Sequence, residues 1–337
     1  MTKGTKIFRI TICVLLALTV LWSVFFGLGF FAFARYMILT NEYGVWVSGV
    51  SVTRDNKSDV LGDGTVSYLP DSNTLVLNNA NIQADYAAVL SKIDLKIMLI
   101  GENKFICKDG EYISAIYAAD TYLYKDISIE GDGSLEIAFE NVSKDAQGIF
   151  ASNIQIMADV TIDMPDCSNI VNGIVCDSSL MLMNQASLTL NNGSAAYSSG
   201  IRVRGNTFLH SGCSINLTTN PGTVEECKGL SINGDLILAE GSAVNVSVDD
   251  ASSANGECLR VNGMIDAGKG ANVNASAKVA SSIECYGAIK LNEGASVSAN
   301  TEGSKKDIVC YGAVVDFGAT VSGEIEALGG VHNKVGI

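Results

Sequence analysis

A short segment recurs along the C-terminal half of the chain and limits what the chain can fold into. Four copies read RGNTFLHSGCSINL, NGDLILAEGSAVNV, NGMIDAGKGANVNA and YGAIKLNEGASVSA, and a fifth, YGAVVDFGATVSG, is one residue shorter between its glycines. In each full copy two glycines stand seven residues apart: Gly205/Gly212, Gly234/Gly241, Gly263/Gly270 and Gly287/Gly294. Self-similarity at a period of roughly 25 residues is typical of solenoids, in which each repeat stacks on its neighbours.

The apolar residues of each repeat alternate with mixed residues, which predicts strands with one face inward. One inward row is Val89, Ile116, Ile149, Ile174, Ile201, Leu230, Leu259, Ile283 and Ile308. A second row, two positions on, is Ala118, Ala151, Cys176, Val203, Ile232, Val261, Cys285 and Cys310. Two further alternating runs complete each repeat, for example Leu236/Leu238 and Val244/Val246.

Three short strands per repeat cannot form a local sheet, so each strand must pair with its counterpart in the next repeat. The sequence therefore predicts an all-β protein, a right-handed parallel β-helix of about nine coils with three short strands per coil. A leucine-rich repeat would need an L-x-x-L-x-L pattern with a helical segment, and a helical solenoid would need a 3.6-residue period. Neither pattern is visible.

The first 35 residues differ from the rest. Lys3, Lys6 and Arg9 precede an uncharged stretch over 10–34, long enough to span a bilayer. This predicts an N-terminal transmembrane helix over 1–35 that is retained as an anchor, with the C-terminal domain extracellular. The alternative is a signal peptide cleaved after Ala34, which would release a secreted protein.

Residues 36–83 do not follow the coil pattern. Two alternating runs, Thr65–Tyr68 and Thr74–Leu77, flank the turn sequence LPDSN, which predicts a small β-hairpin. We expect 36–83 to cap the open first coil of a β-helix over 84–337, because an unpaired solenoid end is an exposed edge.

Composition narrows the function classes. The net charge of −14 argues against nucleic acid as a partner and against contact with anionic lipid beyond the N-terminal helix. The two histidines, His210 and His332, are too few for most zinc or Ser-His-Asp chemistry, and the nine cysteines show no C-x-x-C spacing. Cys285 and Cys310 hold the same inward position in adjacent coils, where a disulfide is permitted, but stacked free thiols are the favoured interpretation.

The opening of the folded region carries a family resemblance. Trp46-Val47, Gly49 and Val52 are followed by LGDGTVSY at 61–68 and NTLVLNNA at 73–80. This resembles bacterial cell-surface parallel β-helix proteins with a "carbohydrate-binding domain", and the resemblance covers 43–325. It implies surface display, polysaccharide binding and, in some members, bound calcium. It brings no catalytic residues. No calcium motif is recognisable here, so no cofactor or metal site is predicted, and bound calcium stays an open alternative.

The outward positions of the first strand form the most varied face and the candidate site. Adjacent coils place Tyr286 above Tyr311 and Tyr117 near Phe150, and aromatic rings with planar polar groups suit sugars. The candidate carbohydrate-binding residues are Tyr117, Phe150, Arg202, Tyr286 and Tyr311. The structural alternative is that stacked aromatics only stabilise the strand ladder.

Arg202, Arg204 and Arg260 on this face suggest a polysaccharide lyase that uses an arginine base. Asp177 and Glu284, however, are placed to pair with Arg204 and Arg260, and no acidic cluster for calcium accompanies them. The outward residues of the third strand, mostly Ser, Thr and Asn, are expected to form a solvated ladder. The GDG turns near Asp63 and Asp132 are expected to be ordinary turns.

Together these observations predict a non-catalytic, extracytoplasmic polysaccharide-binding or adhesion module on a bacterial cell surface, and not an enzyme. The alternative is a rigid structural spacer without a specific ligand, and a polysaccharide lyase is the third reading.

Overall fold

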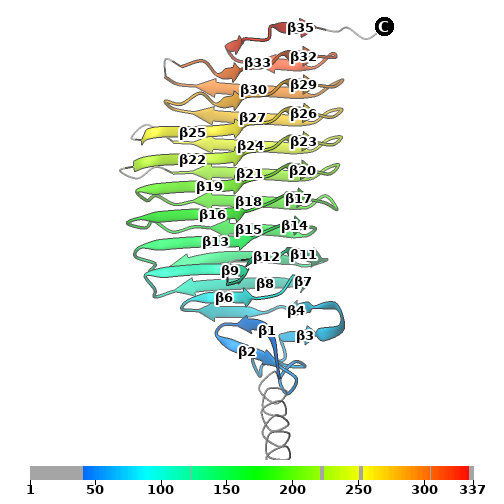
Figure 1. Cartoon of the computed structure of the whole chain (residues 1–337), viewed down its shortest axis with the longest axis vertical. Helices are drawn as coiled ribbons and strands as arrows, with labels where there is room; N and C mark the ends of the chain where they lie inside the picture. The colour runs from blue at the N-terminus through cyan, green and yellow to red at the C-terminus, as the bar shows by residue number, and fades with distance from the viewer. Residues whose placement is uncertain (1–40, 122, 221–223, 250–252, 304, 334–337) are drawn as a thin grey trace, which may run out of the picture. The chain divides into compact units, whose positions relative to one another are not determined.

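The computed structural model describes residues 41–121, 123–220, 224–249, 253–303 and 305–333. From Gly44 onward they form a single three-sided β-solenoid (Figure 1). The prediction of an all-β, right-handed type of parallel solenoid with about nine turns and three strands per turn is confirmed. The expected N-terminal transmembrane helix lies outside the described residues, and within the described ranges no helix has the length and apolar character needed to cross a bilayer.

Three sheets form the sides of the solenoid, and we name them A, B and C. Sheet A has 13 strands, in the order β2 (Val50–Thr53), β1 (Glu42–Val47), β6 (Ala87–Ser91), β9 (Tyr112–Asp120), β13 (Asp145–Ala151), β16 (Ile170–Cys176), β19 (Tyr197–Val203), β22 (Val224–Ile232), β25 (Ser253–Val261), β28 (Ile283–Cys285), β31 (Ile308–Cys310) and β34 (Ile325–Ala327), with β10 (Leu123–Tyr124) beside β9.

Sheet B has 12 strands, in the order β3 (Val66–Leu69), β4 (Thr74–Asn78), β7 (Leu95–Ile100), β11 (Ile127–Gly131), β14 (Ile154–Ile156), β17 (Leu180–Leu182), β20 (Thr207–Leu209), β23 (Leu236–Leu238), β26 (Ile265–Ala267), β29 (Ile289–Leu291), β32 (Val314–Asp316) and β35 (Val331–Asn333). Sheet C has ten: β5 (Asn81–Ala84), β8 (Glu102–Lys108), β12 (Ser134–Glu140), β15 (Asp159–Asp163), β18 (Ser187–Asn192), β21 (Ser214–Thr219), β24 (Ala243–Val248), β27 (Asn272–Ala277), β30 (Ser296–Thr301) and β33 (Thr320–Ser322). Each coil runs from B to C to A.

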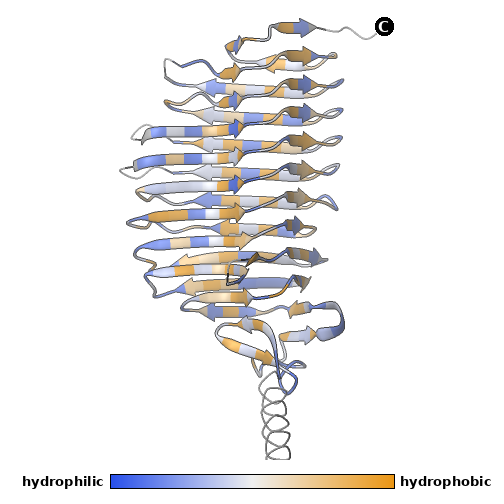
Figure 2. Cartoon of the chain, in the orientation of Figure 1, coloured by the Kyte–Doolittle hydropathy of each residue, from blue (hydrophilic) through white to orange (hydrophobic). Residues whose placement is uncertain are grey.

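The core consists of the predicted inward rows. Val89 pairs with Ile116, and the same register continues coil by coil to Ile283 and Ile308, all of them buried. Figure 2 shows hydrophobic and hydrophilic residues alternating along the strands. At ~1.5–3 kcal/mol for each fully buried aliphatic side chain, these rows are the main stabilising contribution in every coil.

The two repeated glycines serve different purposes. At the corner between sheets A and B, the amide of Gly263 donates to the carbonyl of Gly234 at 2.9 Å, and an added Cβ on Gly263 would lie 2.6 Å from that oxygen. At the corner between sheets B and C, Gly241 has a φ of +66° and open space around its Cα. The first glycine of each repeat therefore permits close stacking of successive corners, and the second glycine permits a left-handed backbone conformation.

A third glycine column, which the sequence analysis did not separate, bends the long strands of sheet A. In β13 both Gly148 and Ile149 are buried, so two successive residues face inward and the alternation shifts by one. The inward side of the equivalent Gly200 is so close to sheet C that a Cβ would lie 2.6 Å from Leu217 Cδ1. The strand is thus drawn toward the core here, and the outward residues on either side of the bend flank a depression.

The predicted N-terminal hairpin is present. β3 and β4 pair antiparallel, with Val66 opposite Leu77, and a short 3-10 helix (η1, Pro70–Ser72) makes the turn between them. β4 also pairs in parallel with β7, so the second strand of the hairpin already belongs to the first coil. β1 pairs antiparallel with β6 and covers the first edge of sheet A.

The eight described cysteines are free thiols, and all but Cys167 are buried. Cys285 and Cys310 are register partners in β28 and β31, as the sequence predicts. A hydrogen bond with Cys310 raises the pKa of the Cys285 thiol, and burial adds to this shift.

Candidate functional site

The outward face of sheet A brings the predicted aromatic residues together in pairs. The rings of Tyr117 and Phe150 stack at a centroid distance of 5.1 Å and an interplanar angle of 11°. Those of Tyr286 and Tyr311 stack at 4.6 Å and 14°. Tyr117 and Phe150 are register partners in adjacent coils, and Tyr286 and Tyr311 directly follow the register partners Cys285 and Cys310, as the alternation predicts.

Stacking along the solenoid axis covers one face of each ring in a pair. The edge of Tyr124 packs against Phe150, with ring centroids 4.7 Å apart and planes at 84°. The guanidinium carbon of Arg260 lies 5.0 Å from the centre of the Tyr286 ring. Within each pair one face of each ring is therefore covered by its partner, and Tyr286 is contacted on its other side by Arg260.

The arginines of this face differ in their partners. Arg204 Nη1 lies 2.5 Å from Asp177 Oδ1, which confirms the expected pair. Arg260 and Glu284 are register partners as expected, but the close ion pair of Arg260 is with Glu257, whose Oε1 lies 2.6 Å from Arg260 Nη1. Two successive residues of β25, Cys258 and Leu259, are buried, so Glu257 and Arg260 on either side of them both lie outward and form this ion pair.

Arg202 is exposed on β19. Among the described residues no ion pair to Arg202 is present. Of the three arginines, Arg202 alone has no ion-pair partner within the part of the chain that the structure describes.

A hollow of about 330 Å³ opens where the depression crosses β9, β13 and β16. We name it the tyrosine cleft; it is lined by Tyr86, Tyr112, Ile113, Ser114, Tyr117, Asp145, Ala146, Gln147, Ile170 and Asn172. Tyr86 and Tyr112 are 62% and 52% exposed. Of the predicted site residues, Tyr117 belongs to the cleft.

Hydrogen bonds and charges order the cleft. Ser114 Oγ donates to Gln147 Oε1 at 3.1 Å, and the Lys144 ammonium lies 5.1 Å from the centre of the Tyr112 ring. Burial, reinforced by the neighbouring Tyr124 and Tyr86, raises the pKa of the Tyr117 hydroxyl, which stays protonated and able to donate at neutral pH. Asp145 accepts hydrogen bonds from Asn169 Nδ2 at 2.8 Å and from the Ile170 amide at 3.2 Å.

Sequence reasoning missed Tyr86, Tyr112, Gln147 and Asn172 because it treated each sheet A strand as one regular alternation. The available signal was the Gly-Ile or Gly-Leu dipeptide of four successive coils, at Gly148, Gly173, Gly200 and Gly229. An extra inward residue at that point implies a bend, and a bend implies a second set of outward rows.

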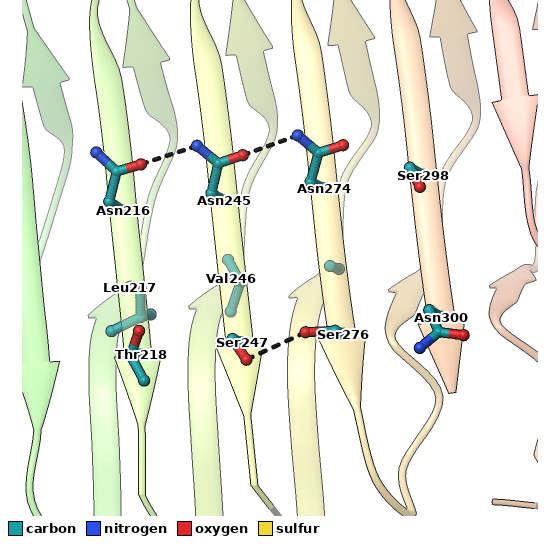
Figure 3. Close-up of a pocket in the computed structure, with 11 residues that line it drawn as sticks. Asn216, Leu217, Thr218, Asn245, Val246, Ser247, Asn274, Ser276, Ser298 and Asn300 are labelled. Atoms are coloured by element: carbon teal, nitrogen blue, oxygen red, sulfur yellow. Dashed lines mark hydrogen bonds between the residues drawn. The ribbon is translucent and has the colours of Figure 1, made fainter. Parts of the chain in front are cut away.

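A second hollow, of about 450 Å³, lies over the outward face of sheet C (Figure 3). We name it the asparagine groove; it is lined by Asn216, Leu217, Thr218, Asn245, Val246, Ser247, Asn274, Ala275, Ser276, Ser298 and Asn300. Its polar residues belong to the expected Ser/Thr/Asn ladder.

Metal ligands do not gather at either hollow: the described residues contain no group of three or more His, Cys, Asp or Glu side chains arranged to hold an ion. In the turn near Asp63, the carboxylate accepts hydrogen bonds from the Thr65 amide at 2.9 Å and the Thr65 hydroxyl at 2.7 Å. These bonds lower the pKa of Asp63 and hold the turn closed.

Comparisons with protein-family models, with curated proteins and with solved structures found no match to this chain. The fold places the chain in the class of parallel β-solenoids with an N-terminal cap.

Proposed function

We propose that the chain is a non-catalytic polysaccharide-binding or adhesion module, displayed on the outer side of a bacterial membrane and tethered by residues 1–35. Its binding face is the outward side of sheet A. The tyrosine cleft is the principal contact, and Arg202 and the edges of the Tyr286–Tyr311 pair are further contacts.

The observation that carries the proposal is the composition of the cleft. Sugars combine apolar ring faces with hydroxyl edges, and protein sites for them combine aromatic side chains with a few fixed polar groups. Tyr86 and Tyr112 supply exposed rings, and Gln147 and Asn172 supply amides that both donate and accept. Ser114 fixes the Gln147 amide, which lowers the ordering cost of binding.

The electrostatics favour a sugar with little or no negative charge. The chain carries a net charge of −14, and Asp145 is the acidic residue that lines the cleft. A densely anionic polymer would be repelled by this surface.

A rigid spacer is the second candidate, and the aromatic pairs favour it. Cross-strand stacking stabilises a ladder without any ligand. Each pair also has a further contact: Tyr124 packs against Phe150, and Arg260 lies over Tyr286.

Affinity electrophoresis of the full-length chain in non-ionic detergent tests the proposal, with gels that contain cellulose derivatives, xylan, pectin or mucin glycans. We expect retardation by at least one neutral polymer and its loss in the Tyr86→Ala/Tyr112→Ala variant. Tyr197→Ala is the matched control, because Tyr197 is an exposed tyrosine that follows Tyr112 in register by three coils but does not line the cleft.

Unchanged mobility across the whole panel would favour the spacer. Release of unsaturated uronate or of reducing ends would instead favour a lyase or hydrolase.

A further inference from the structure

The asparagine groove contains a ladder of amides that runs along the solenoid axis. Asn245 Nδ2 donates to Asn216 Oδ1 at 2.8 Å, and Asn274 Nδ2 donates to Asn245 Oδ1 at 2.8 Å (Figure 3). The three residues are register partners in β21, β24 and β27. Parallel pairing therefore repeats the same group at intervals of ~4.8 Å.

The ladder leaves at least half of each amide's hydrogen-bonding capacity unused. An asparagine amide has two N–H donors and two oxygen lone pairs, and the ladder uses one of each at Asn245. The bonds to both neighbours fix which way the Asn245 amide points, so its remaining donor and acceptor are oriented before any ligand arrives.

Hydroxyl groups line the groove beside the ladder. Ser276 Oγ donates to Ser247 Oγ at 3.1 Å, and this pair stands two residues along the same strands from Asn274 and Asn245. Serine side chains are shorter than asparagine, which leaves room above them within the hollow of about 450 Å³. Two parallel rows of donors and acceptors thus follow the axis.

The charge and chemistry of the groove select the ligand class. No charged or aromatic side chain lines it, so neither an ionic group nor a stacked ring would be recognised. A polymer with a hydroxyl-rich edge at every unit would match rows that repeat at every coil. It would gain bonds with each coil it crosses.

We propose that the asparagine groove is a second binding site, for a neutral, extended polysaccharide that lies parallel to the solenoid axis. This deepens the proposed function and rests on it, since it names a further face and the class of polymer. Successive sugar units contact successive coils, and affinity increases with chain length until the polymer spans β21 to β30.

The test uses the full-length chain in non-ionic detergent, hydroxyethyl cellulose as the neutral polymer, and cello-oligosaccharides of increasing length in calorimetry. Asn245→Ala removes the middle of the ladder, and we expect about three- to tenfold weaker binding. Ser214→Ala is the control, because Ser214 faces outward on β21 outside the groove and should leave binding unchanged.

The same measurements in the Tyr86→Ala/Tyr112→Ala background separate the two sites. Retardation that persists there and disappears on adding Asn245→Ala supports the groove. If the tyrosine variant alone abolishes binding, or Asn245→Ala has no effect, the groove is not a site although the proposed function stands. No retardation of the unmodified chain by any polymer would reject both. If polygalacturonate, an anionic polymer, bound to the groove as tightly as hydroxyethyl cellulose, the inference that the ligand is a neutral polysaccharide would be wrong.

Discussion

Arg260 and Tyr311 lie against Tyr286 from the coils on either side of it. The Arg260 guanidinium carbon is 5.0 Å from the Tyr286 ring centre, and the Tyr311 ring is stacked on Tyr286 at 4.6 Å. Three successive coils are therefore joined on the outside of sheet A, where the strands β28 and β31 are only three residues long.

This arrangement predicts an energetic coupling between the tyrosines. In a double-mutant cycle of Tyr286→Ala and Tyr311→Ala, we expect a coupling of about 0.5–1.5 kcal/mol in the free energy of unfolding, measured by chemical denaturation. Purely additive effects would show that the stack contributes nothing beyond burial.

Ile232, the last residue of β22, and Asn233, which follows it, test the alternation. Ile232 is fully buried and Asn233 is exposed. Ile232→Asp places an unpaired carboxylate in the core and should cost several kcal/mol, whereas Asn233→Asp should stay within about 0.5 kcal/mol. Thermal melts of the two variants decide this, and similar melting temperatures would contradict the assigned inward row.

The fold was predictable because an apolar or small residue returns at the same inward position in each coil. The row that contains Ile232 extends over eight coils, and it is buried as one row when each strand pairs in parallel with its counterpart in the next coil. The candidate site was less predictable, because it depends on the bend at Gly148 and its equivalents. One extra inward residue brings Glu257 within reach of Arg260. Simple alternation placed Glu284 beside Arg260 but did not predict that Glu257 makes the close ion pair.

The orientation of the aromatic rings was also not predictable from the sequence. The sequence places Tyr286 and Tyr311 in neighbouring coils, but it does not reveal that their faces cover each other. Side-chain rotation decides whether an aromatic pair presents faces or edges, and periodicity carries no information on rotamers.

The two glycine rows should respond differently to substitution. Gly263→Ala would bring a Cβ to 2.6 Å from the Gly234 carbonyl oxygen and should cost about 1–3 kcal/mol or more. Gly241→Asn should cost less than about 1 kcal/mol, because asparagine tolerates left-handed backbone and nothing lies within 4 Å of the added atom. Denaturation midpoints of the two variants give the comparison; a larger loss for Gly241→Asn would contradict the assigned roles.

Cys167 should react slowly despite its partial exposure. Burial, and then the negative charges of Asp145 and Asp166, raise the pKa of its thiol to about 11. The thiolate is the reactive form, so at pH 8 alkylation should be about 100-fold slower than for a thiol of ordinary pKa and should accelerate up to about pH 11. Asp166→Asn removes one repelling charge, lowers that pKa and should speed the reaction at pH 8. Peptide mapping after timed alkylation measures this, and a rate independent of pH would contradict the shift.

The last prediction concerns the two outward arginines of β19 and the corner that follows it. Arg204 is held by Asp177 at 2.5 Å, whereas Arg202 lacks an ion-pair partner within the described residues. Under the proposed function, Arg202→Ala should weaken polysaccharide retardation about two- to fivefold, because a free guanidinium can donate to sugar hydroxyls. Arg204→Ala should have a smaller effect on binding, since its donors already face a carboxylate. Neither change should lower the melting temperature appreciably, because exposed ion pairs contribute little to stability. Affinity electrophoresis of both variants, with melting curves as the fold control, shows which substitution weakens retardation more. A larger effect of Arg204→Ala would contradict the prediction and place the sugar contact at the corner after β19.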